Sequence, residues 1–75
     1  MKQMNAAEIK ARERIAKRTT AQLVTDFEVT NAIKISLELS IVRGWIMDEL
    51  AKRDIDAAEA WFDSYEDSPR RFFLE

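Results

Sequence analysis

The sequence predicts an all-α fold: a small three- to four-helix bundle with a docked aromatic C-terminal tail. Only one Gly and one Pro occur among its 75 residues, which argues against a turn-rich β fold. Helix-capping residues also precede segments in which apolar residues recur at intervals of three and four. A chain of this length supports one core, so we expect a single domain over residues 1–75. Its helices are expected at about 5–18, 20–30, 36–53 and 55–65.

The first helix is rich in Ala, Glu, Lys and Arg, which all favour helix. Asn5 is placed to cap it, with Glu8 at the capping-box spacing. Glu8 also precedes Arg12 by four residues, the favourable order for an ion pair. Because its apolar stripe is thin, we expect this helix to be the least buried element.

The second helix has Thr19 or Thr20 as its N-cap, and Asn31 follows as a stop signal. The helical spacing places its large apolar residues on one face. These residues are Leu23, Val24 and Phe27.

The third segment fits two patterns. Residues 33–41 alternate between apolar and polar, as in a strand, but the chain offers no convincing partner strand. A helical stripe fits a longer span: Ile35, Leu39, Val42, Ile46 and Leu50, widened by Leu37, Ile41 and Trp45. We therefore predict a helix with Ser36 as its N-cap, preceded by a connection buried at Ile33 and Ile35.

Gly44 lies in the middle of this helix, where Gly is less stable than Ala by about 1 kcal/mol. A residue that costs stability often marks a close approach. We expect another element of the chain to cross over Gly44. The functional alternative is a groove for a partner.

The fourth helix is capped by Asp54 or Asp56, and Asp56 has Glu59 at the capping-box spacing. It should end near Tyr65, because Pro69 disfavours helix in the residue before it. Three large apolar residues then fall in the last four positions of the chain. We expect this tail to dock on the bundle.

The formal net charge of −2 conceals an asymmetry. Residues 1–18 hold six basic and two acidic side chains, a net of +4, and residues 19–53 hold four and five, a net of −1. Residues 54–75 hold two and seven, a net of −5. The two ends either lie against each other or meet partners of opposite charge.

The basic residues of the first helix are candidates for phosphate contact. They are Lys10, Arg12, Arg14, Lys17 and Arg18. Aromatic residues do not interleave with them, as they do in single-strand binders, and no Leu heptad follows to form a dimeric zipper. A solvated helix that pairs its own charges is the favoured interpretation, and nucleic-acid binding is an alternative.

Aromatic residues gather toward the C-terminus, where they are candidates for a partner surface as well as for the core. The candidate surface comprises Trp61, Phe62, Tyr65, Phe72 and Phe73. Trp61 and Phe62 point about 100° apart on one helix, so we expect one of them to be less buried than the other. The exposed one would form a patch that binds a protein partner or a second copy.

The absence of Cys and His excludes disulfides, thiolate and imidazole metal sites, and catalysis by Ser-His or Cys-His pairs. An acidic stretch that begins at Asp54 fails as a calcium loop, because Glu59 stands where Gly is required and Tyr65 where Glu is required. We therefore expect no enzyme activity, metal, cofactor or small-molecule substrate. The chain shows no signal-peptide pattern and no long apolar run, so we expect a cytoplasmic protein without membrane association.

Part of the sequence also resembles other known proteins. It is carried by residues 42–50 (VRGWIMDEL), by Trp61-Phe62-Asp63 and by residues 67–74 (DSPRRFFL). Over about residues 20–75 the chain resembles small uncharacterised proteins of bacterial phages and other mobile elements. This resemblance implies a bacterial accessory protein, and it carries no catalytic residues.

The sequence therefore predicts a small non-catalytic protein-interaction or regulatory module, which binds a protein partner or a second copy of itself. Two alternatives remain open. One is a DNA-binding accessory protein that uses the first helix. The other is an acidic mimic of nucleic acid that occupies a host protein.

Overall fold

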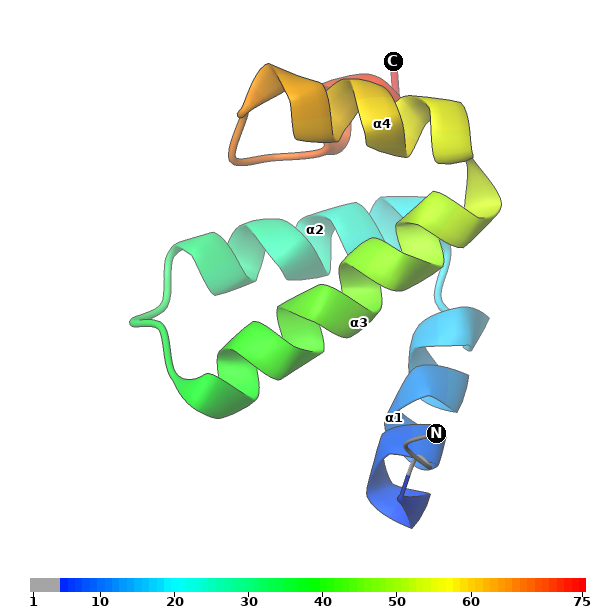
Figure 1. The fold of residues 1–75 in the computed structure, drawn as a ribbon, viewed down its shortest axis with the longest axis vertical. Helices are drawn as coiled ribbons and strands as arrows, with labels where there is room; N and C mark the ends of the chain where they lie inside the picture. The colour runs from blue at the N-terminus through cyan, green and yellow to red at the C-terminus, as the bar shows by residue number, and fades with distance from the viewer. Residues whose placement is uncertain (1–4) are drawn as a thin grey trace.

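Five helices make up the part of the chain that this computed structural model describes, residues 5–75 (Figure 1). They are α1 (Ala6–Lys17), α2 (Thr20–Asn31), α3 (Leu37–Arg53), α4 (Ile55–Ser64) and the single turn α5 (Arg70–Phe73). The described residues contain no strand, so the predicted all-α bundle is confirmed and the strand alternative for residues 33–41 is wrong. Residues 1–4 of the expected domain lie outside the described part.

Side-chain caps set where the four longer helices begin. The capping residues are Asn5, Thr19, Ser36 and Asp54. The side-chain oxygen of each accepts a hydrogen bond from the backbone N–H of the residue three positions later. Thr19 forms a complete capping box, because Gln22 bonds back to its backbone N–H. The predicted capping box of Asp56 and Glu59 is wrong, since Asp54 already occupies the cap of α4.

The helices α2, α3 and α4 follow one another in alternating directions, so that α3 packs against both of the others (Figure 1). The tail helix α5 packs between α2 and α4. The helix α1 packs on α3, at the opposite end of the molecule from α4 and the C-terminus (Figure 1). The described part of the basic end, residues 5–18, therefore does not lie against the acidic end.

The core is built from seven apolar residues, each less than 5% exposed. They are Leu23, Val24 and Phe27 of α2, Ile46 and Leu50 of α3, and Ala58 and Trp61 of α4. Phe72 and Phe73 of α5 pack against this cluster, and Pro69 before them is fully buried. The predicted docking of the aromatic tail is confirmed.

The helix α1 contributes no fully buried residue, although Ile15 packs against the core. Its C-terminal end is held by Arg53 of α3. The Arg53 guanidinium donates hydrogen bonds to the carbonyl oxygens of Ala16 (3.1 Å) and Arg18 (2.7 Å) and to the Glu49 carboxylate (2.9 Å). One cation thus satisfies backbone acceptors at the end of α1 and joins it to α3.

Two predictions, one about the connection before α3 and one about Gly44 within α3, are wrong. Ile33 and Ile35 are more than half exposed, because the connection between α2 and α3 extends beyond both helices instead of folding onto the core (Figure 1). No element crosses Gly44: a Cβ built there would meet nothing within 4 Å. The side of α3 at Gly44 is therefore open.

The tail is also held by charge. The Arg70 guanidinium donates to both carboxylate oxygens of Glu28 on α2 (2.9 and 2.6 Å), and the Ser68 hydroxyl donates to the same group (2.6 Å). These bonds to Arg70 and Ser68 lower the pKa of Glu28 from 4.5 to about 2. Because the folded state favours the carboxylate, the pairing stabilises the fold above pH 4.5, and this contribution is lost as the pH falls toward 2.

We therefore expect Glu28→Gln to lower the melting temperature at pH 7 and to have a diminishing effect as the pH falls from 4.5 to about 2. Thermal unfolding followed by circular dichroism across this range measures the difference. Glu59→Gln is the control, because Glu59 makes no ion pair with any described residue. A difference between Glu28→Gln and the native chain that does not change with pH would contradict this account.

Candidate protein-interaction surfaces

The structure divides the predicted aromatic surface into buried and exposed members. Trp61 is only 4% exposed and packs edge-on against Phe27 (5.0 Å between ring centroids) and Phe73 (6.4 Å). Its indole N–H donates to the carbonyl oxygen of Glu66 (2.9 Å). Trp61 is therefore part of the core, and the expectation that Trp61 and Phe62 differ in burial is confirmed.

Phe72 and Phe73 are half-buried, because they attach the tail to the core. The guanidinium of Arg71 lies over the Phe72 ring, 4.3 Å from its centroid, and pairs with the Glu66 carboxylate. These contacts hold the loop after α4 in place. The two rings thus act mainly in the fold.

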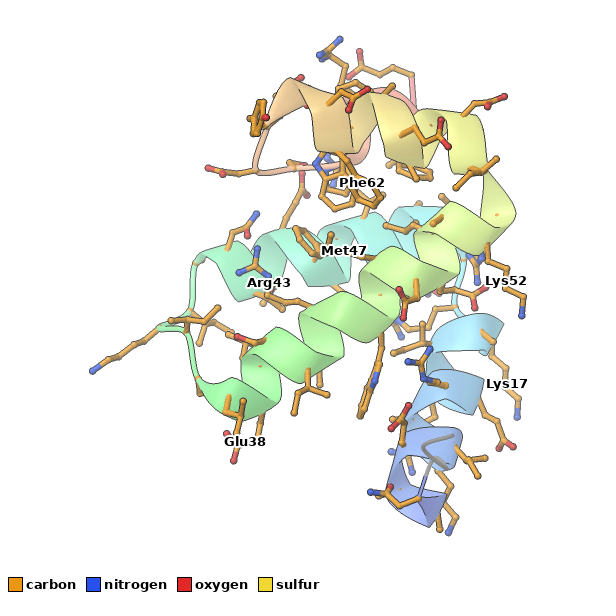
Figure 2. The ribbon with its side chains drawn as sticks, viewed as in Figure 1. Lys17, Glu38, Arg43, Met47, Lys52 and Phe62 are labelled. Atoms are coloured by element: carbon orange, nitrogen blue, oxygen red, sulfur yellow. The ribbon has the colours of Figure 1, made fainter. Side chains whose placement is uncertain are left out.

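Phe62 and Tyr65 remain as the exposed aromatic residues, at 42% and 93% exposure. Tyr65 ends α4 in the left-handed conformation (φ 59°), which L-residues adopt at a cost. The two residues border an open groove of about 420 Å³, which Met47 and Arg43 of α3 also line (Figure 2). The Arg43 guanidinium is held in this wall by Asn31 (2.8 Å) and by the Phe27 ring (4.7 Å).

Two acidic residues line this groove together with the cation Arg43, and a third is exposed nearby in the sequence. Glu66 and Asp67 line it directly, and Asp63 is an exposed neighbour of Phe62 on α4. Asp63 and Asp67 make no ion pair with any described residue. We name the region formed by Phe62, Tyr65, Met47 and these three acids the aromatic–acidic surface. Its chemistry suits a partner that offers an apolar side chain flanked by Lys or Arg.

The five basic residues predicted for phosphate contact are not equally free. Arg12 pairs with Glu8 (3.0 Å) and with Asp48 of α3 (3.4 Å), and Arg18 makes two hydrogen bonds to Asp26 of α2. Lys10, Arg14 and Lys17 are exposed, and none of them pairs with an acid in the described part of the chain. Three cations of the five therefore remain available to an external anion.

Sequence reasoning missed a second apolar surface, on α3. Leu37 is 75% exposed and Ile41 is 43% exposed, although both were expected to widen the buried face. Along the same helix, Trp45 lines a groove of about 310 Å³ between α1 and α3. The signal in the sequence was the width of the apolar face, since eight apolar residues on one helix exceed what a single packing face can bury.

The described residues contain no cluster of three or more acidic side chains that could hold a metal ion. None of the described helices has the length and apolar character needed to cross a membrane. No protein-family model, curated protein or solved structure matches the chain.

The exposed ring of Tyr65 leads to a prediction about stability. We expect Tyr65→Gly to raise the free energy of unfolding by about 1 kcal/mol, because Gly adopts φ 59° without strain and the lost ring packs on nothing. Urea unfolding measures the change. Tyr65→Ala keeps the strained backbone and removes the ring, so it should leave stability nearly unchanged. A large loss of stability in Tyr65→Ala would show that the ring supports the fold.

Proposed function

We propose that this chain is a small non-catalytic protein-interaction module that binds a basic protein partner through its aromatic–acidic surface. The observation that carries the proposal is Tyr65. Its ring is almost fully exposed and its backbone is strained, so the residue lowers stability without packing in return. Tyr is enriched at interfaces because its ring offers apolar area together with a hydroxyl.

Charge supports a basic partner. Residues 54–75 carry a net charge of −5, and their two cations are already paired, Arg70 with Glu28 and Arg71 with Glu66. The remaining carboxylates are exposed, and Asp63 and Asp67 lie within two residues of Phe62 or Tyr65 in the sequence. This field would attract a basic surface and speed association at low salt. An acidic mimic of nucleic acid is one form of this proposal, in which the basic partner is itself a nucleic-acid-binding protein.

Photo-crosslinking tests the proposal directly. A benzophenone amino acid placed at Tyr65 should give one specific crosslinked product in cells of the source organism. The same group at Val29, which is 53% exposed on α2, should not give that product. We expect Asp63→Lys combined with Asp67→Lys to abolish the product, because both charges then repel a basic partner. Equal products from positions 65 and 29, or no effect of the charge reversal, would contradict the proposal.

Nucleic-acid binding through α1 is the second candidate, favoured by the three free cations Lys10, Arg14 and Lys17. Contacts from three cations predict that affinity for duplex DNA falls roughly 40-fold between 50 and 200 mM salt. Electrophoretic mobility shift at both salt concentrations measures this fall. Replacement of all three cations by Gln should abolish the shift. The control Lys34→Gln, which removes an exposed cation just before the N-terminus of α3, should not abolish it. No shift at 50 mM salt removes this candidate.

The bacterial phage or mobile-element origin and the cytoplasmic location stay predictions from the sequence. Both agree with a small accessory protein that acts by surface binding. The crosslinked product would identify the partner and therefore also bear on the origin.

A further inference from the structure

We propose that a second copy of the chain binds across α3 in an antiparallel, two-fold arrangement. This proposal rests on the proposed function of a protein-interaction module. It names a partner for the α3 surface, which is separate from the aromatic–acidic surface. The relevant face of α3 carries Leu37, Ile41 and Gly44 at helical spacings of four and three, with Trp45 beside them. The described chain leaves Leu37 and Ile41 exposed, whereas Trp45 is half-buried, with the Arg12 guanidinium of α1 5.8 Å from its ring centroid.

The N-terminal half of the face projects apolar side chains. Leu37 and Ile41 lie one helical turn apart, and Leu37 is the most exposed aliphatic residue among those described, at 75%. Burial of these two side chains against a partner would be favourable, because it would remove apolar surface from water. We call this pair the α3 ridge.

The C-terminal half of the same helix borders a groove that both apolar and charged side chains line. The groove between α1 and α3 has a volume of about 310 Å³, and its apolar walls are Ile9, Ile15, Ala16 and Trp45. An apolar cavity of about 150 Å³ can hold a benzene molecule, so this groove has room for roughly two aliphatic side chains. The ridge supplies two such side chains.

Ridge and groove lie on opposite sides of the Gly44–Trp45 step of one helix. A two-fold axis through that step, perpendicular to α3, would place the ridge of each copy at the groove of the other. Such an interface is closed and self-complementary, which is the commonest geometry of soluble dimers. The same surface thus supplies both halves of the contact.

Gly44 lies at the centre of this arrangement. No atom of another described element comes within 4 Å of a Cβ built there, so no contact with another element explains a residue that weakens the helix. The missing side chain would let two helices approach closely. Asp48, on the same face toward its C-terminal end, is already neutralised by Arg12 at 3.4 Å.

The charged residues at the two ends of α3 fit the same antiparallel arrangement. Glu38 and Lys52 are exposed at opposite ends of the helix, and neither forms an ion pair with any described residue (Figure 2). Fourteen residues separate them, or nearly four helical turns, so they lie on about the same side. Trp45 is midway between them. Antiparallel pairing centred there brings Glu38 of each copy to Lys52 of the other, which gives two ion pairs for each dimer.

A charge-swap experiment tests this register on the intact chain. Sedimentation equilibrium of the native chain should show a monomer–dimer equilibrium. Glu38→Lys and Lys52→Glu should each weaken it about tenfold, because each replaces two attractions by two repulsions. An equimolar mixture of the two variants should form a heterodimer about as tight as the native dimer, since every charge at position 38 then faces an opposite charge at position 52.

Further variants test the contact surface. Leu37→Ser and Gly44→Ala should both weaken the dimer, and Gly44→Ala should do so while it raises the stability of the monomer. Tyr65→Ser is the control, because it changes only the aromatic–acidic surface. Circular dichroism confirms that each variant is folded. Weakening in Tyr65→Ser but not in Leu37→Ser would overturn the proposal.

Two further outcomes would also overturn it. One is a native chain that stays monomeric up to about 1 mM. The other is a dimer that neither charge variant alters, which would place the contact elsewhere. Neither outcome affects the crosslink expected from position 65, so failure of this inference is distinguishable from failure of the proposed function.

Discussion

The packing of the Trp61 indole against α2 and the C-terminal tail fixes the rotation of α4, because this ring is the largest side chain that the core holds. Adjacent residues on a helix point about 100° apart, so burial of Trp61 turns Phe62 toward solvent. The indole N–H also bonds the Glu66 carbonyl oxygen, which holds the chain just after Tyr65. The exposed aromatic pair is therefore a geometric consequence of how the core is filled.

The size of that core explains why so much apolar surface stays outside it. Among the described residues, the three helices and the short tail bury only Pro69 and Thr30 besides the seven core residues, and the ridge of α3 lies outside this set. Polar contacts take over at the periphery, where Arg53 holds α1 and Arg70 holds α5 through Glu28. The two candidate binding surfaces carry apolar side chains that the core does not bury, beside charges that are only partly paired within the chain.

The helix boundaries were predictable because they depend on local chemistry. Asn5, Ser36 and Asp54 cap helices through bonds to residues three positions away, and no tertiary contact is needed to find them. The exposure of Ile35 and the open space at Gly44 depend instead on where other helices end. The candidate surfaces were predictable in part: the aromatic cluster was visible, but its division between core and solvent, like the exposed ridge of α3, required the packing.

The attachment of α1 has a consequence for the order in which the molecule opens. This helix buries no residue fully and is held by the half-buried Ile15 and by polar contacts of Arg53 and Arg12, so it can detach while all seven core residues stay packed. Its amide hydrogens should therefore exchange with solvent through a local opening that requires less free energy than global unfolding. Detachment would also remove one wall of the groove beside Trp45, so the molecule carries a binding site whose shape depends on its least stable helix.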